Sequence, residues 1–136
     1  MLLRYLEQQC ADMQLTCVDR PEVVQLAQQS SSSASNSSKV RFVAGDLFCD
    51  NLPSADVYLL SRVLHDWPDE KAAQILKHIA QQSADNAQLI VIDREASLAN
   101  RHSLLSLHMH LLQGAKERTR DEWQQLFAQS GWTITS

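Results

Sequence analysis

Two kinds of hydrophobic pattern alternate along the chain. Compact apolar runs rich in β-branched and aromatic residues predict strands, and they cover residues 15–18, 40–43, 55–60 and 88–93. Apolar residues at helical spacing predict amphipathic helices, and they cover residues 2–10, 22–29, 69–82 and 120–130. Strands that alternate with helices are typical of a mostly parallel sheet with helices on both faces. The chain is therefore predicted to have an α/β fold.

The boundaries of these elements carry their own signals. Pro21 suits the first position of a helix, and Gly131 suits the residue that follows one. Residues 88–93 form the clearest buried strand in the sequence, and residues 132–135 predict one further strand. The serine-rich run 30–38 has no side chain that could anchor a core, so it is predicted to be a flexible surface loop.

The composition is that of a soluble globular protein, with 136 residues, 44% of them hydrophobic and 21% charged, which suffices for one domain. The net charge of −4 and the lack of a basic cluster argue against a nucleic-acid partner. No apolar run approaches the roughly 18 residues of a membrane span. Three widely spaced cysteines without a C-x-x-C pair indicate neither a disulfide framework nor a zinc site. We therefore expect a cytoplasmic protein without a structural metal.

Ionisable residues gather where the predicted strand 55–60 ends. Arg62, His65 and Asp66 follow it directly. In open α/β sheets, ligands bind outside the carboxyl ends of the strands, so a histidine at this point is well placed for chemistry. The alternative is that His65 and Asp66 are ordinary turn residues before the next helix.

Carboxylates also follow three of the predicted strands, as Asp19, Asp46 and Asp93. An acidic side chain at a strand end can accept hydrogen bonds from ribose hydroxyls in nucleotide-binding α/β folds. Aspartate also favours strand ends and helix caps for structural reasons. No glycine-rich phosphate-binding motif occurs in the sequence, so these residues alone indicate a nucleotide-like ligand and no more.

Four segments, in the order 16–24, 40–48, 56–67 and 116–119, carry a family resemblance. The third contains Leu-His-Asp-Trp and the fourth is Lys-Glu-Arg-Thr. Together they resemble S-adenosylmethionine-dependent O-methyltransferases of the caffeate and hydroxyindole (acetylserotonin) type. The resemblance extends over residues 15–131 and implies a Rossmann-like methyltransferase sheet.

The resemblance also implies a cofactor and the residues that hold it. The cofactor is S-adenosylmethionine. Asp19 matches the residue that binds its ribose, and Asp46 with the backbone of Leu47 matches the contacts to adenine. Arg62 stands where relatives place a cofactor-binding residue near the methionine end.

For the reaction, the resemblance implies methyl transfer to a hydroxyl of a small aromatic substrate, a phenol or a hydroxyindole. His65 matches the general base, and Asp93 and Glu117 match its two flanking carboxylates. Asp93 is one methylene shorter than the glutamate that many relatives carry. The implied substrate-binding residues are Asp66, His108 and Met109.

Relatives of this type contain parts that the 136 residues do not. Their first strand and glycine-rich loop would precede residue 1, together with an N-terminal dimerisation domain, and their last strand would follow residue 136. The sequence is thus expected to be a partial catalytic domain in which the strands ending at Asp19 and near Leu60 lack their shared neighbour. Two other functions stay open, a non-catalytic remnant or partner-binding module and a different nucleotide-dependent enzyme.

Overall fold

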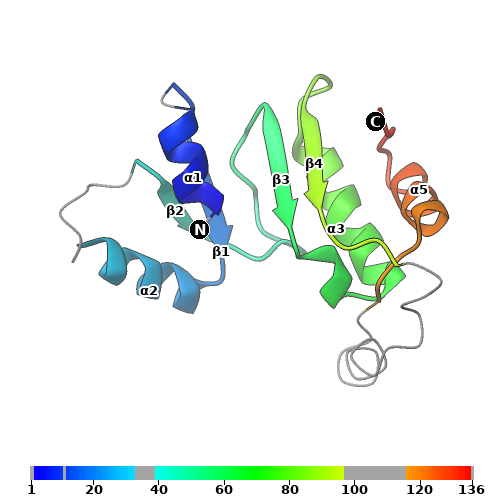
Figure 1. Cartoon of the computed structure of the whole chain (residues 1–136), viewed down its shortest axis with the longest axis horizontal. Coiled ribbons are helices and arrows are strands. Elements are labelled where there is room, and N and C mark those ends of the chain that lie inside the picture. The colour runs from blue at the N-terminus through cyan, green and yellow to red at the C-terminus, as the bar shows by residue number, and fades with distance from the viewer. Residues whose placement is uncertain (1, 11, 33–38, 97–115, 136) are drawn as a thin grey trace. The chain divides into compact units, whose positions relative to one another are not determined.

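A computed structural model describes residues 2–10, 12–32, 39–96 and 116–135. The chain divides into two compact units, Met1–Pro53 (unit 1) and Ser54–Ser136 (unit 2). The elements of both are labelled in Figure 1. In the described residues, β1 pairs with β2 and β3 with β4, both in parallel.

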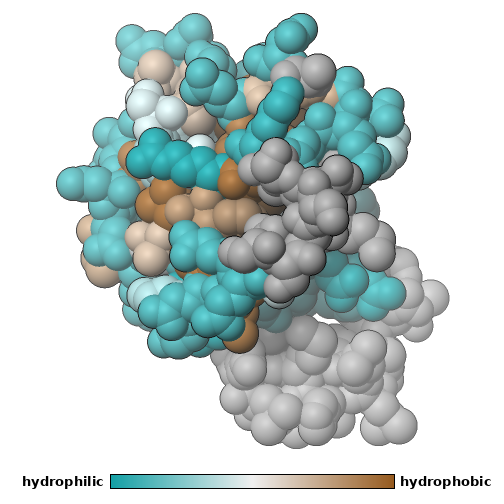
Figure 2. Space-filling model, turned by 90° about the vertical axis from the view of Figure 1, so that its left-hand side faces the viewer, coloured by the Kyte–Doolittle hydropathy of each residue, from teal (hydrophilic) through white to brown (hydrophobic). Residues whose placement is uncertain are grey.

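Unit 1 is built from α1 (Leu2–Gln9), β1 (Thr16–Asp19), α2 (Pro21–Ser32) and β2 (Arg41–Ala44). Helix α2 is the crossover that joins the two parallel strands, and it contacts both of them. Among the described residues of unit 1, the buried hydrophobic ones are Val24 and Val40. Several large apolar side chains of this unit are exposed, and Figure 2 shows hydrophobic surface framed by hydrophilic side chains.

Helix α2 begins at Pro21 as predicted but runs on to Ser32. The prediction that residues 30–38 form a loop is therefore wrong for residues 30–32. The Ser30 hydroxyl donates a hydrogen bond to the Leu26 carbonyl oxygen at 2.9 Å. Serine can bond to a carbonyl four residues earlier in this way, so a polar run can continue a helix for a turn.

Unit 2 is built from β3 (Val57–Ser61), the 3-10 turn η1 (Leu64–Asp66), α3 (Asp69–Gln82), β4 (Gln88–Ile92) and α5 (Arg120–Ala128). Helix α3 is the crossover between β3 and β4, and it packs against α5. The core of the unit is mainly the apolar face of α3, which contributes Ala72, Ala73, Ile75, Leu76 and Ile79. Leu126 of α5 is also buried.

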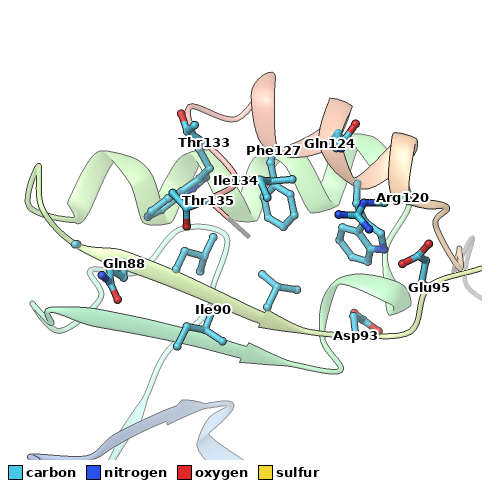
Figure 3. Close-up of a pocket in the computed structure, with 15 residues that line it drawn as sticks. Gln88, Ile90, Asp93, Glu95, Arg120, Gln124, Phe127, Thr133, Ile134 and Thr135 are labelled. Carbon is cyan, nitrogen blue, oxygen red and sulfur yellow. The ribbon is translucent and has the colours of Figure 1, made fainter.

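Strand β4 is not the fully buried strand that its sequence predicts. Its residues alternate between half-buried and exposed, and the exposed fractions of Ile90 and Ile92 are both 46%. Helices α3 and α5 lie on the same side of the β3–β4 pair (Figure 3). Alternate side chains of a strand point to opposite faces, so the isoleucines point away from these helices.

Both ends of α5 have recognisable caps. Thr119 and Glu122 form a capping box at its start. At its end, Gly131 has a φ of 84°, and the Trp132 N–H donates to the Phe127 carbonyl oxygen at 3.1 Å. A left-handed glycine with this backbone bond is the usual Schellman ending of a helix. Gly131 thus ends the helix as predicted.

Residues 132–135 do not form the predicted strand. Instead, the indole Nε1 of Trp132 donates a hydrogen bond to the Leu76 carbonyl oxygen at 3.0 Å. The side chain thereby fixes this segment to α3. Within the described residues, no helix is both long and apolar enough to span a bilayer.

Candidate functional site

His65 lies on the turn η1 that follows β3. Before it, Arg62 adopts a φ of 57°, a left-handed conformation that is uncommon for residues other than glycine. The Arg62 N–H donates to the Ile92 carbonyl oxygen at 2.8 Å, which extends the β3–β4 pairing by one bond. Leu64 is fully buried and anchors the turn in the core. The backbone therefore leaves the strand abruptly and presents His65 at its carboxyl end.

The imidazole of His65 forms a close pair with the carboxylate of Asp93. His65 Nδ1 and Asp93 Oδ1 are 2.7 Å apart, and the other carboxylate oxygen accepts the His65 backbone N–H at 3.1 Å. The side-chain exposures are 13% for His65 and 3% for Asp93. Two bonds to one carboxylate fix both the backbone and the ring orientation. With the proton on Nδ1, the ring keeps Nε2 as its acceptor.

Asp66 faces the other ring nitrogen. Its Oδ1 lies 3.2 Å from His65 Nε2, and its side chain is 45% exposed. The predicted role of Asp66 in substrate binding stays a prediction, and the structure places its carboxylate beside Nε2.

Glu117 forms an ion pair with Arg94, with Arg94 Nη1 and Glu117 Oε1 3.8 Å apart. Its role as the second carboxylate beside His65 stays a prediction, since the ring contacts described are with Asp93 and Asp66. Arg62 is exposed. The predicted substrate residues His108 and Met109 lie outside the described residues, as do residues 104–112 as a whole.

Arg118, the arginine of the Lys-Glu-Arg-Thr motif, is the most buried polar residue of the site, with an exposure of 0%. Its Nη1 donates to the Leu64 carbonyl oxygen and its Nη2 to the Trp67 carbonyl oxygen, both at 2.8 Å. Its Nε donates to Asp69 Oδ1 at 2.8 Å. The guanidinium also lies 5.1 Å from the ring centroid of Trp123. This role was not predicted from the sequence. The available signal was the basic motif Lys-Glu-Arg-Thr together with Asp69, the acidic residue that directly follows His-Asp-Trp-Pro.

Lys116 extends the network around Asp69. Its Nζ lies 2.7 Å from Asp69 Oδ2 and 3.1 Å from Glu122 Oε1. Burial alone would raise the pKa of Asp69, but hydrogen bonds from Lys116 and Arg118 outweigh it and hold the pKa of that carboxyl below its usual range. Burial likewise disfavours the charged lysine, yet Asp69 and Glu122 raise the pKa of Lys116. Asp69 and Lys116 therefore both remain charged at neutral pH.

In unit 1, the predicted ribose and adenine residues lie at neighbouring strand ends. Asp19 is the last residue of β1 and pairs in register with Ala44, two residues before Asp46. Asp19 Oδ1 accepts the Arg20 N–H, and Asp46 Oδ1 accepts the Phe48 N–H, each at 2.8 Å. A carboxylate can accept about four hydrogen bonds, so each retains capacity for a ligand.

Gly45, directly before Asp46, lies close to β1. A Cβ at Gly45 would lie 3.1 Å from Val18 Cγ1, so the Val18 side chain would have to shift slightly to accommodate a larger residue. Leu47, whose backbone was predicted to contact adenine, is half-buried. The structure thus brings Asp19 and Asp46 to one edge of unit 1, and His65, Asp66 and Asp93 together in unit 2. Among the described residues, no group of three or more histidine, cysteine, aspartate or glutamate side chains has an arrangement that could hold a metal ion.

A groove of about 840 Å³ lies between β4, α5 and the segment after Gly131. Figure 3 shows Asp93 and Glu95 at one end of it and Gln88 toward the other, with Phe127 facing the strand. Its size is within the range of small-molecule pockets. Asp93, the partner of His65, is one of the residues that line the groove.

Residues 3–133 match the family model of the O-methyltransferase domain. The chain therefore belongs to the O-methyltransferase domain family. It is 36% identical over 135 residues to a human probable bifunctional dTTP/UTP pyrophosphatase/methyltransferase protein, a match that covers 96% of this chain and 22% of the human one. The resemblance inferred from the sequence motifs is confirmed.

Solved structures agree with this assignment. Human N-acetylserotonin methyltransferase in complex with S-adenosylmethionine is 33% identical, with a TM-score of 0.83 over 96% of this chain and 38% of its own. An O-methyltransferase from neocarzinostatin biosynthesis, in complex with S-adenosylmethionine and 2-hydroxy-5-methyl naphthoic acid, is 30% identical, with a TM-score of 0.85 over 99% and 41%. The predicted Rossmann-like α/β fold is confirmed. The chain spans roughly a fifth to two fifths of these relatives' lengths.

Proposed function

We propose that this chain is part of an enzyme that transfers a methyl group from S-adenosylmethionine to a hydroxyl of a small aromatic substrate, with His65 as the general base. The observation that carries the proposal is the His65–Asp93 pair, 2.7 Å between Nδ1 and Oδ1, at the carboxyl end of β3. The substrate class is suggested by two relatives, an N-acetylserotonin methyltransferase and an O-methyltransferase in complex with 2-hydroxy-5-methyl naphthoic acid.

A phenolic hydroxyl has a pKa of about 10 and is a poor nucleophile at neutral pH. An imidazole whose Nδ1–H is held by Asp93 offers Nε2 to accept the proton as the oxygen attacks. The nearly buried carboxylate then stabilises the imidazolium that forms. Asp93 engages the residue through both oxygens, so the shorter side chain still reaches the ring. Asp66 would leave Nε2 as the hydroxyl arrives. Glu117 would add negative charge nearby.

The hydrogen-bond acceptors of unit 1 fit an adenosine ligand. Ribose hydroxyls and the adenine amino group are donors, and Asp19 and Asp46 are acceptors at neighbouring strand ends. The backbone of Leu47 and the side chain of Arg62 are proposed as further contacts. When bound, S-adenosylmethionine supplies an activated methyl group on a sulfonium. The residues of the chain bind and orient the cofactor and the substrate, and His65 removes the proton from the hydroxyl.

A second candidate is a non-catalytic remnant or partner-binding module of the same family. The sequence resemblance also implies that full-length relatives form homodimers. For either candidate we propose the cytoplasm, where the three thiols would stay reduced.

Titration of the chain with S-adenosylmethionine by calorimetry tests the proposal. We expect saturable binding that weakens at least tenfold in Asp46→Asn. We also expect transfer of radiolabelled methyl to simple catechols or hydroxyindoles, lowered at least a hundredfold in His65→Ala with cofactor binding retained. His78→Ala, a histidine on α3, is the matched control and should keep full activity. Cofactor binding without any transfer would favour the remnant, and a folded sample that binds no cofactor would overturn the proposal.

A further inference from the structure

We propose that Arg118 is a positioning residue for His65, which it holds in place by hydrogen bonds to the two ends of the turn η1. This inference rests on the proposed role of His65 as the base. Arg118 lies 53 positions after His65 in the sequence and does not touch the ring. It acts on the backbone that carries the ring.

The guanidinium donates hydrogen bonds to backbone carbonyls that precede and follow His65 in the chain. The Leu64 carbonyl oxygen precedes the histidine and the Trp67 carbonyl oxygen follows it, and each accepts one Arg118 nitrogen at 2.8 Å. The third donor, Nε, binds Asp69 at the start of α3. The three acceptors are thereby kept at fixed separations by one rigid planar group.

The turn needs this external support because its own hydrogen bonds are weak. Within η1, the Asp66 N–H to Val63 oxygen and Trp67 N–H to Leu64 oxygen distances are both 3.3 Å. Good N–H···O bonds are about 2.7 to 3.2 Å long. The residue before the turn, Val63, has no side-chain cap. The 2.8 Å bonds from Arg118 to the two ends of the turn are therefore shorter than the two bonds within it.

The backbone around Arg118 also connects the turn to the segment that carries Asp93. The Lys116 N–H donates to the His65 carbonyl oxygen at 2.9 Å. The Arg118 carbonyl oxygen accepts the Ala96 N–H at 2.8 Å, three residues after Asp93. A shift at Arg118 would thus alter the separation of His65 Nδ1 and Asp93 Oδ1, on which the orientation of the base depends.

The test compares Arg118→Lys with the wild-type chain and with Arg41→Lys, an exposed arginine in unit 1. Lysine keeps the charge but has one ammonium, which cannot reach three separate acceptors. In histidine-labelled samples, NMR reports the His65 Nδ1–H resonance without cofactor or substrate. We expect it far downfield in the wild type and in Arg41→Lys, and shifted upfield by at least about 1 ppm or lost in Arg118→Lys. An unchanged resonance in folded Arg118→Lys would overturn the inference.

Kinetics give a second readout where methyl transfer is measurable. Arg118→Lys should lower kcat at least tenfold while the KM for the cofactor changes less than twofold, because the cofactor contacts are made elsewhere. A variant that only destabilised the fold would keep kcat per folded molecule, and this result would also contradict the inference. If Arg118→Lys does not fold, Asp69→Asn decides the question by the same resonance, with a smaller upfield shift expected. Absence of methyl transfer by the wild type would reject the proposed function while the NMR comparison still tests Arg118.

Discussion

Unit 1 and unit 2 differ in how much of each is buried. Unit 2 buries most of one face of α3 together with Leu64, Leu126 and the charged Arg118. Among the described residues of unit 1, only Val24 and Val40 reach the same burial, and Leu26 and Tyr5 are 64% and 60% exposed. The residues around the proposed base are thus packed against a core that lies within unit 2. Unit 1 contributes two strand ends with carboxylates and little core of its own.

The largest effect should come from the core of unit 2. Leu76 on α3 is fully buried, so Leu76→Ala should lower the free energy of unfolding by about 2 to 5 kcal/mol. The matched control, Leu26→Ala on α2, removes the same atoms from an exposed position and should change it by less than about 0.5 kcal/mol. Urea denaturation measures both. Equal losses in the two variants would remove the contrast between the units.

A smaller effect is expected at the end of α5. Gly131 has a φ of 84°, and an added Cβ would meet no atom within 4 Å. Gly131→Ala should therefore cost about 1 to 2 kcal/mol through backbone strain alone. Gly131→Asn should cost less, because asparagine tolerates this conformation. Thermal unfolding compares them, and an alanine variant as stable as the wild type would show that the chain ends α5 differently.

The start of α5 should be slightly less sensitive. Thr119 Oγ1 accepts the Glu122 N–H, and the Glu122 carboxylate accepts the Thr119 N–H at 2.8 Å. Thr119→Ala should cost about 1 kcal/mol. Thr119→Ser keeps the oxygen and should retain most of the stability. If serine and alanine lose the same amount in urea denaturation, the capping bond contributes nothing.

The smallest effect concerns pH. The Thr119 backbone N–H lowers the pKa of Glu122, and Lys116 with Arg118 lowers that of Asp69 despite its burial. A lowered pKa in the folded state gives stability that is present above about pH 4 and is lost as the pH falls through the folded values. Because both carboxylates are partly exposed, the loss should be below about 1 kcal/mol. Urea midpoints between pH 5 and pH 3 should fall less steeply in Asp69→Asn, and parallel curves would contradict this.

Periodicity was sufficient to predict the elements whose helical face or strand run is strong. Helix α3 runs over residues 69–82 as predicted, and β1 to β4 lie within a few residues of their predicted positions. The errors occur where local pattern competes with tertiary contacts. The Trp132 side chain bonds to α3 instead of its segment forming a strand. Ile90 and Ile92 are apolar yet exposed. Their exposure could not be predicted, because a run of apolar residues does not show which face of the strand is covered.

For the site, the sequence indicated where His65 and Asp93 fall but not the contacts that hold them. A motif places a residue at a strand end, and the parallel pairing of β3 and β4 then brings the two together. The bonds from Arg118 to the turn could not be assigned in this way, because their acceptors are backbone carbonyls. Such acceptors have no residue type, so no sequence pattern identifies them.

The hydrogen bonds that Arg118 makes to the turn and to Asp69 also bear on the order in which unit 2 folds. Its bonds to Leu64, Trp67 and Asp69 span 54, 51 and 49 residues. Contacts of such large sequence separation close a long loop and form after the local helices. On a ribosome, the backbone around His65 emerges well before the arginine that holds it. We therefore expect the segment with the proposed base to be among the first parts of unit 2 to be synthesised and among the last to acquire its final geometry.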